Sequence, residues 1–339
     1  MAPCSLYHIY LMKTFVKPLN LGKLLLPTNV LYSPLAGCSD YPFRQMATRY
    51  PVGLMFCEMV KMDALVRHEP TTYQLLDYDP SMRPIGAQIC GSKPQLAGPC
   101  AKIIEELGFD VVDLNCGCPV DKVTKDGSGS GMLKNPELIG EVISNMVAAV
   151  SIPVTVKIRA GWDDHSINAP LITQIAEAAG AKAISIHGRT RMQKYTGNAN
   201  WDHIKAAKGV AREIKVIGNG DVFDEKAAHT LFEHTGCDAV LVSRGTFGKP
   251  WIAEDICRFD AGLPLCSYDI KQHLLDHMHL ITSYQSDRKA ILDMRRVGCW
   301  YLRSGTGTKK LREALNKTKN LKELEKLIQN YDWSQTSFS

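Results

Sequence analysis

The stretch Asp110-Val-Val-Asp-Leu-Asn-Cys-Gly-Cys-Pro-Val-Asp-Lys-Val-Thr-Lys-Asp-Gly-Ser-Gly-Ser-Gly131 joins a buried strand to a long polar loop. Val111, Val112 and Leu114 make the first part apolar, and the helical pattern before it stops at Gly108. An amide, two thiols, a proline and several glycines then follow. Binding and catalytic groups concentrate on loops held by a rigid scaffold. The stretch therefore predicts a strand with a functional loop at its carboxyl end.

Seven further strand-like runs flank this one and alternate with amphipathic helical patterns. The expected strands cover 29–33, 54–58, 84–90, 110–114, 153–159, 183–187, 214–218 and 238–243, and helical patterns between them include 94–107, 136–150, 171–179 and 224–234. Eight strands alternating with helices over about 230 residues predict an α/β fold of the (β/α)8 TIM-barrel type. A doubly wound open sheet is the alternative, but no Gly-x-Gly-x-x-Gly motif follows the first strand.

Polar side chains fall at or just past the ends of nearly all these strands. They are Asp40, Glu58, Gln88, Asn115, Lys157, Arg159, His187, Asn219, Asp221 and Arg244. Any one of them could be structural. In a barrel, however, the carboxyl ends of the strands converge on one mouth, where active sites lie. The recurrence therefore predicts a site at that mouth.

The alternation of strands and helices stops near residues 259–267. Apolar residues then recur every three or four positions over 269–285, 287–303 and 309–330, which predicts a small C-terminal helical bundle. We therefore expect an N-terminal extension (1–24), a barrel domain (25–262) and an all-helical domain (263–339).

The net charge of +5 arises in the helical part of the chain. Residues 1–266 hold 27 Lys and Arg against 27 Asp and Glu, whereas residues 267–339 hold 13 against 8. A neutral body with a basic appendage indicates a polyanionic partner such as RNA. A solvated helical tail with surplus Lys is an equally weighted alternative.

Composition also bears on location and on metals. Eleven cysteines at irregular spacings are typical of reduced intracellular thiols. No run approaches the ~18 apolar residues of a membrane span, and residues 1–12 lack the features of a secretory signal. We expect a cytoplasmic protein with no membrane partner. Cys116 and Cys118 have no second Cys/His pair nearby to complete a zinc site, so no metal is expected.

Cys118 is the candidate for chemistry in the central loop. Pro119 forces an extended backbone at Cys118, which prevents a helix from continuing there. A thiol so held could act as a nucleophile or as a general acid, because a free cysteine is mostly protonated near pH 7. The alternative is that Cys116 and Cys118 are small hydrophobic residues packed under the loop.

Two features indicate an anionic ligand. The segments Ile217–Asp221 and Val242–Thr246 follow the last two expected strands, where TIM barrels commonly bind phosphate, and Arg244 would add a charged contact. A plain turn is the alternative for the first segment. Lys157 lies in an apolar strand and needs an anionic partner, because burying an unpaired ammonium is very costly. That partner is either a bound ligand or a structural carboxylate, Glu58 or Asp113.

Together these motifs resemble the tRNA-dihydrouridine synthase family of bacterial type. The matching segments are Ser33–Asp40 with Pro42-Phe43-Arg44, Gln88 with Gly91, Asn115–Pro119 with Lys122-Val123, Val156–Arg159 with Gly161-Trp162, His187–Arg191, Gly218–Asp221, Arg244-Gly245 with Pro250-Trp251, and Arg296-Val-Gly298 with Trp300-Tyr-Leu302. They span about residues 25–330. The chain departs from the family at Leu35, Cys116 and Ser243, where Met, Met and Gly are common. Leu35 and Ser243 would mainly offer backbone contacts.

The resemblance implies an FMN-dependent enzyme that reduces the C5=C6 bond of tRNA uridines with NADPH as electron donor, and it makes Cys118 the general acid. The residues implied to bind FMN are Ser33, Pro34, Leu35, Ala36, Gln88, Asn115, Lys157, His187, Asn219, Gly220, Asp221, Ser243 and Arg244. Those expected to contact tRNA are Lys122, Lys125, Arg159, Arg189, Arg191, Arg295, Arg296, Lys309, Lys310 and Arg312. A monomer is expected.

Two rival interpretations remain open. A flavin barrel that reduces a small molecule, of the dihydroorotate or enone type, shares the barrel motifs but has no need of a basic helical domain. An RNA-binding module with a degenerate barrel would explain the basic domain. The presence of Cys118, Lys157 and His187 argues against that second interpretation.

Overall fold

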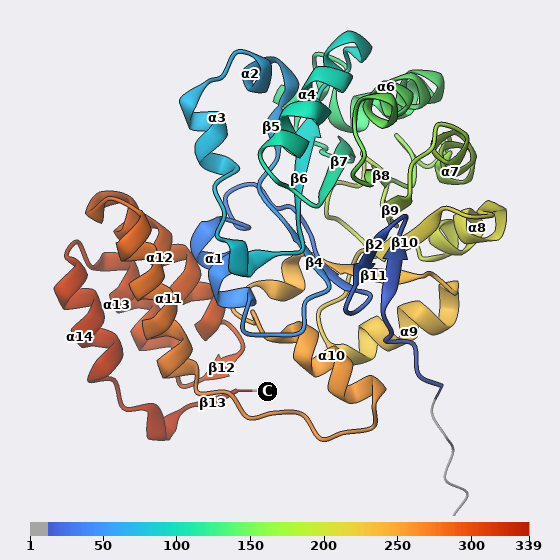
Figure 1. The fold of residues 1–339 in the computed structure, drawn as a ribbon. Coiled ribbons are helices and arrows are strands. Elements are labelled where there is room, and N and C mark those ends of the chain that lie inside the picture. Colours follow the sequence, from blue (N-terminus) through green and yellow to red (C-terminus); the bar gives the residue numbers. More distant parts are fainter. Residues whose placement is uncertain (1–12, 339) are drawn as a thin grey trace, which may run out of the picture.

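The computed structural model of the protein describes residues 13–338, which form a closed barrel of eight parallel strands with a helical bundle packed against one side (Figure 1). Neighbouring strands pair in parallel around the ring, and β3 pairs with β11 to close it. The ring therefore has no free edge. This confirms the expected TIM barrel with a C-terminal helical part and excludes the open sheet.

The barrel strands fall where the sequence predicts them. They are β3 (Val30–Tyr32), β4 (Leu54–Phe56), β6 (Ile85–Cys90), β7 (Val111–Cys116), β8 (Val154–Arg159), β9 (Ala183–His187), β10 (Lys215–Asn219) and β11 (Ala239–Val242). A two-residue strand, β5 (Val60–Lys61), pairs with β6 and was not expected. The inward-facing and outward-facing side chains of the ring are both buried, which explains the nearly continuous apolar runs in the sequence.

Helices surround the ring and extend into the bundle. They are α1 (Tyr41–Ala47), α2 (Met62–Val66), α3 (Pro70–Leu75), α4 (Pro94–Glu106), α5 (Asp121–Thr124), α6 (Pro136–Ala149), α7 (Ala169–Ala178), α8 (Asp202–Val210), α9 (Glu225–Thr235), α10 (Ile252–Asp260), α11 (Ile270–Tyr284), α12 (Asp287–Leu302), α13 (Lys309–Lys317) and α14 (Leu321–Gln329).

Local signals explain where these helices begin and end. In α9 the Asp224 carboxylate accepts a hydrogen bond from the Ala227 N–H, and Gly236 ends the helix with a φ of 65°. Only a residue that tolerates a positive φ can take that left-handed conformation without strain. Asn135 caps α6 in a similar way, and Pro136 occupies its first turn. The four helices expected between barrel strands, at 94–107, 136–150, 171–179 and 224–234, lie within two residues of the observed ones.

A short hairpin, missed in the sequence, packs against one end of the barrel interior. Strands β1 (Leu19–Leu21) and β2 (Leu24–Leu26) pair antiparallel, and Leu19, Leu21 and Leu26 are buried. They join a cluster with inward-facing side chains near the amino ends of the barrel strands, such as Leu31, Val111 and Ala239. Leu19 and Leu21, within the expected N-terminal extension, thus pack into the barrel core.

The bundle has a hydrophobic core of its own. Leu274, Met294, Leu311 and Ile328, one from each of its four helices, are buried in it. The pattern over 309–330 predicts a single helix, and that prediction is wrong. The backbone is extended at Thr318, and the Asn320 side chain caps a new helix by accepting from the Lys322 and Glu323 N–H groups.

Specific contacts join the bundle to the barrel. Tyr41 of α1 stacks on Tyr284 of α11 with ring centroids 4.5 Å apart, and Arg49 forms an ion pair with Asp276 at 2.5 Å. The C-terminal strand β13 (Ser337–Phe338) pairs with β12 (Gly305–Thr306).

Among residues 13–338, no helix is both long enough and apolar enough to cross a bilayer. The expectation about a secretory signal concerns residues 1–12, which lie outside the described residues.

Candidate active site

A cavity of about 460 Å³ opens at the carboxyl ends of the barrel strands. Its volume is in the range typical of small-molecule and cofactor sites. All thirteen residues expected to bind the cofactor line it, together with Cys118 and Arg159. Cys38, within the matched segment Ser33–Asp40, also lines it, and further lining residues that the sequence did not indicate include Met59, Tyr195, Phe223 and Phe247. No strand ends at these positions, so no pattern singled them out.

The two cysteines of the central loop have different environments. Cys116 is fully buried at the end of β7, where its thiol contacts the Met132 sulfur at 3.6 Å, and burial raises its pKa well above the ordinary value. Cys118 is partly exposed and lines the cavity. The Asn115 side-chain oxygen accepts hydrogen bonds from the Gly117 N–H at 3.1 Å and from the Cys118 N–H at 2.9 Å. Cys118 is therefore the loop thiol held at the cavity.

Lys157 extends from β8 into the cavity wall. Its ammonium donates to the Asn219 side-chain oxygen at 3.1 Å, and the Asn219 amide nitrogen is held by the Leu241 carbonyl and the Ser243 hydroxyl. Desolvation, followed by the charge of Arg159, lowers the pKa of Lys157 to about 8. No carboxylate among the described residues forms an ion pair with it. The alternative of an ion pair between Lys157 and Asp113 or Glu58 is therefore not found among the described residues. Asp113 accepts hydrogen bonds from Gln88 and Thr155 instead, and Glu58 accepts one from the Gly37 N–H.

The cavity wall carries an excess of positive charge. Arg159 is buried and donates to the carbonyls of Gly117, Thr190 and Lys194, and burial lowers its pKa to about 10. Burial, then the charges of Lys157 and of nearby arginines, holds the pKa of His187 well below its ordinary value. His187 is therefore neutral near pH 7. The field in this cavity favours an anionic ligand.

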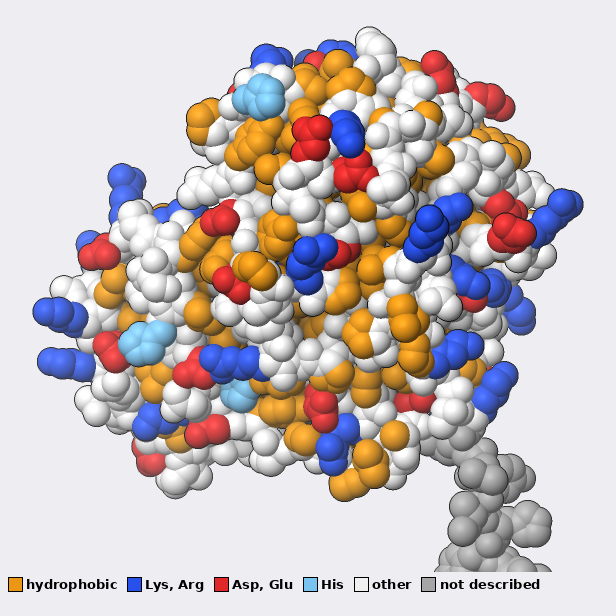
Figure 2. Space-filling model, viewed as in Figure 1, with side chains coloured by type: hydrophobic (Ala, Val, Ile, Leu, Met, Phe, Trp, Pro, Cys, Tyr) orange, Lys and Arg blue, Asp and Glu red, His pale blue; other side chains and the backbone are white. Residues whose placement is uncertain are grey.

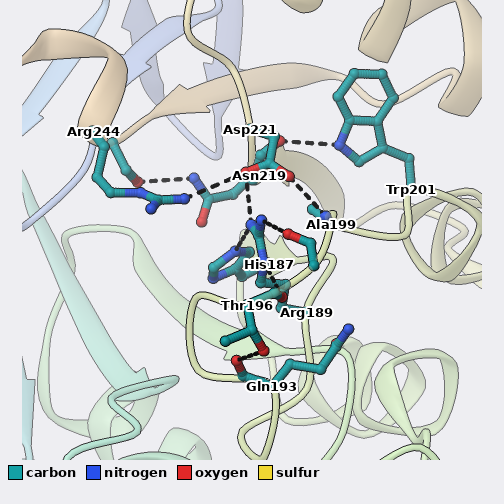
Figure 3. A network of polar contacts seen from close by, with 12 residues as sticks. His187, Arg189, Gln193, Thr196, Ala199, Trp201, Asn219, Asp221 and Arg244 are labelled. Atoms are coloured by element: carbon teal, nitrogen blue, oxygen red, sulfur yellow. Dashed lines mark hydrogen bonds and ion pairs between the residues drawn. The ribbon is translucent and has the colours of Figure 1, made fainter.

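The ends of β9, β10 and β11 meet in the polar network of Figure 3. Arg189, from the loop after β9, is buried and forms an ion pair with Asp221 at 2.7 Å. The same guanidinium donates to the carbonyls of Thr196 and Gly197. Burial would raise the pKa of Asp221, but the hydrogen bonds from Arg189 and from the Ala199 N–H outweigh it, so that pKa is lowered. The Arg189 guanidinium thus links two loops within the described residues, and its expected contact with the substrate stays a prediction.

Close backbone packing completes this end of the site. Gly220 has a φ of 114°, and a Cβ there would lie 2.8 Å from the His187 ring. The Trp201 indole donates to the Gly220 carbonyl at 3.0 Å (Figure 3). Arg244 lies between two exposed aromatic rings, 5.0 Å from the Tyr195 centroid and 5.2 Å from that of Phe223. It is only weakly paired with Asp221, at 3.4 Å, which leaves its guanidinium available to a ligand.

The other cationic residues expected at the substrate surface fall into two groups. Lys122, Lys125, Lys309 and Lys310 are exposed. The arginines are instead engaged within the protein or partly buried. Arg191 is paired with Asp121 and stacks 4.5 Å from the Trp162 ring. Arg295 donates to the Thr318 carbonyl, Arg296 is paired with Asp293, and Arg312 is partly buried. On the face shown in Figure 2, the Lys and Arg side chains of the bundle are interspersed with Asp and Glu. The bundle therefore presents no continuous basic patch on that face.

No group of three or more His, Cys, Asp or Glu side chains within residues 13–338 could hold a metal ion.

Comparison with known proteins places these features in context. The family model described as "Dihydrouridine synthase (Dus)" matches residues 31–336. "Probable tRNA-dihydrouridine synthase 1" of Synechocystis is 36% identical over 319 residues, covering 93% of this chain and 89% of that protein. "tRNA-dihydrouridine synthase B" of Pseudomonas aeruginosa is 34% identical over 302 residues, covering 88% and 91%. Among solved structures, morphinone reductase superposes with a TM-score of 0.54 at 15% identity, over 77% of this chain and 93% of that one, which supports the shared barrel fold.

Proposed function

Because this chain belongs to the dihydrouridine synthase family, we propose that it reduces the C5=C6 bond of specific uridines in tRNA to give 5,6-dihydrouridine, with FMN as its cofactor and NADPH as the source of electrons. One observation carries the proposal: the partly exposed thiol of Cys118, three side-chain amides and several cations converge on one cavity at the barrel mouth. The cations suit an anionic ligand, and the exposed thiol suits a substrate that takes up a proton.

The residues around the cavity fit FMN. The Lys157 ammonium faces the cavity with no carboxylate partner among the described residues, so it suits the electron-rich pyrimidine edge of a flavin. Arg244 and Ser243, at the end of β11, suit a phosphate group. Gln88, Asn115, Asn219 and His187 line the space between these two ends. The bound cofactor would supply a hydride to C6 of the uracil ring.

Cys118 supplies the proton in this proposal. Its thiol lines the cavity, and the Asn115 side chain fixes the backbone N–H groups at 117 and 118. As C6 receives the hydride, the Cys118 S–H gives its proton to C5, and the resulting thiolate is reprotonated from solvent. The product gains one hydride and one proton, and the two electrons come ultimately from NADPH.

The tRNA substrate explains the domain arrangement. A uridine stacked within a folded tRNA must be flipped into the cavity, which costs a few kcal/mol. Phosphate contacts from Lys and Arg hold the RNA without reading its sequence. We assign this task to the helical domain, residues 263–339, and to Lys122 and Lys125 beside the mouth. Lys309 and Lys310 are the most exposed cations of the set in the bundle. A small-molecule substrate would leave that domain without a role.

The decisive experiment maps dihydrouridine in tRNA from cells that lack this protein and express it again in trans. Wild-type protein is expected to restore specific dihydrouridines, and Cys118→Ala is expected to leave them absent or reduced at least a hundredfold. Cys116→Ala, at a buried neighbouring thiol, is the matched control and should restore them. A purified wild-type protein that binds no FMN, or full restoration by Cys118→Ala, contradicts the proposal.

A further inference from the structure

A continuous chain of hydrogen bonds runs through the barrel interior beneath the cavity. The Gln88 side-chain nitrogen donates to Asp113 Oδ2 at 2.7 Å, and the Asn115 side-chain nitrogen donates to Gln88 Oε1 at 2.7 Å. Asn115 Oδ1 then accepts from the backbone N–H groups of Gly117 and Cys118. At the other end, the Thr155 hydroxyl donates to Asp113 Oδ1 at 2.6 Å.

Strand register places these residues side by side. Gln88 of β6, Asp113 of β7 and Thr155 of β8 are directly paired in the sheet. Asn115 lies two residues beyond Asp113 on the same face of β7, one layer nearer the cavity. Asp113 is 2% exposed, and burial raises its pKa to about 6, so it is ionised near pH 7. An apolar side chain would ordinarily be more stable at this buried position, because burying a carboxylate costs free energy.

The direction of the chain follows from the chemistry of its two ends. An ionised carboxylate only accepts hydrogen bonds, so the Gln88 amide must turn its nitrogen to Asp113 and its oxygen to Asn115. Asn115 must then turn its nitrogen to Gln88, which leaves its oxygen for the loop. Backbone N–H groups only donate, so the loop requires the same orientation of Asn115. The two ends therefore agree, and reversing either amide would bring like groups into contact.

We propose that Asp113 is a positioning residue that sets the orientation of the Gln88 and Asn115 amides and through them holds the backbone of the Cys118 loop at the cavity. Each amide nitrogen uses one of its two hydrogens within the chain. Both residues line the cavity, so their remaining N–H groups are the ones available to a ligand. The site thus selects a ligand edge that offers carbonyl or ring-nitrogen acceptors. The catalytic consequence rests on the proposed role of Cys118, whereas the effect on the loop does not.

Amide hydrogen exchange of residues 115–120 in the purified protein tests this inference directly. In Asp113→Ala, exchange at Gly117 and Cys118 is expected to accelerate at least tenfold, and kcat with tRNA to fall ten- to a hundredfold while KM stays within twofold. Asp113→Asn can still present a carbonyl oxygen to Gln88, because the Thr155 hydroxyl can accept from its amide nitrogen. This variant should keep both quantities within about fivefold of wild type. Thr155→Val removes the other bond to the carboxylate and should behave likewise.

Circular dichroism first establishes that each variant is folded. Asp113→Ser, whose side chain is too short to reach Gln88, replaces Asp113→Ala if the alanine variant does not fold, with the same expected outcome. Wild-type exchange at Gly117 and Cys118 in the folded variant overturns the inference, as does an Asp113→Asn variant no better than Asp113→Ala. If wild-type protein forms no dihydrouridine but the exchange pattern holds, the proposed function fails and the assignment of Asp113 stands.

Discussion

The ring of Phe247, which lines the cavity, stacks on the ring of Trp300 in α12 with centroids 4.2 Å apart. The cavity wall and the helical bundle are therefore in direct contact. The chain also approaches closely at this joint, since a Cβ on Gly248 would lie 2.4 Å from the Trp300 carbonyl group. Arg296 lies 5.2 Å from the Trp300 ring and packs against Gly37 in the loop after β3. Helix α12 of the bundle therefore contacts the cavity wall at Phe247 and the loop after β3 at Gly37.

Replacing Trp300 should weaken the contact between the cavity wall and the helical bundle. We expect Trp300→Ala to reduce the free energy of unfolding by about 2 kcal/mol, because it removes a half-buried aromatic ring that stacks on Phe247. Dihydrouridine formation should fall more steeply than FMN content, because the cavity itself remains. Thermal unfolding and product analysis measure the two effects. Trp300→Phe should retain most of both. Leu292→Ala, at a residue 54% exposed on the same helix, is the control and should change stability by less than about 0.5 kcal/mol.

The pair of Arg189 and Asp221 should be sensitive to even a conservative change. Arg189→Lys keeps the charge but cannot reach Asp221 and the Thr196 and Gly197 carbonyls together, because a single ammonium lacks the guanidinium fork. We expect a loss of about 2–4 kcal/mol in the free energy of unfolding, since the replacement leaves buried groups unpaired. FMN affinity should fall as the loop after β9 loosens. Denaturant unfolding and flavin titration provide the measurements. Arg212→Lys, at an exposed position, should leave both quantities unchanged.

The barrel could be predicted from the sequence because its signals are local and repeated. Runs such as Val154–Arg159 are rich in β-branched residues, and Gly236 or Pro136 marks a helix boundary without reference to the rest of the chain. The hairpin at Leu19–Leu26 gave no such signal, since its two three-residue strands, Leu-Asn-Leu and Leu-Leu-Leu, are too short for a period-2 pattern and resemble a fragment of helix. The break at Thr318–Asn320 was hidden because α13 and α14 both continue the apolar spacing of three and four.

The cavity lining could be predicted for a different reason. Parallel barrel strands bring their carboxyl ends together whatever their sequence, so polar residues at those ends must meet. Which of these side chains bond to each other depends on their geometry, and the spacing of residues along the chain does not give that geometry. Nothing in the order of residues shows that Arg189 pairs with Asp221, or that Asp113 faces Gln88 and not Lys157. The order of residues likewise does not show that Arg191, a predicted substrate contact, pairs with Asp121.

The buried carboxyl of Asp113 should make stability depend on pH. Burial raises its pKa from 3.8 to about 6, so between these values the folded protein binds more protons than the unfolded chain. Stability from this group therefore falls by about 2 kcal/mol as pH rises from 4 to 6, out of a total of about 3 kcal/mol from pH 3 to above pH 7. Asp113→Asn has no such proton to lose. The difference in free energy of unfolding, variant minus wild type, should increase over this range and level off above pH 7. Denaturant unfolding at pH 4, 5, 6 and 7.5 measures it, and parallel curves for the two proteins would contradict the assignment.

Salt dependence should separate the cations that contact tRNA from those that hold the bundle together. Lys309 and Lys310 are exposed at the start of α13, so we expect them to contact phosphates and to release counterions on binding. Replacing both with alanine should weaken tRNA binding and reduce the slope of log K against log salt by about 1 to 2, with thermal stability unchanged. Arg295 donates to the Thr318 carbonyl at 2.9 Å across the bundle. Arg295→Ala should therefore lower the melting temperature while changing the salt slope by less than about 0.5. Equal slopes for the double lysine variant and wild type would remove Lys309 and Lys310 from the RNA surface, because a lysine that binds phosphate cannot be lost without that change.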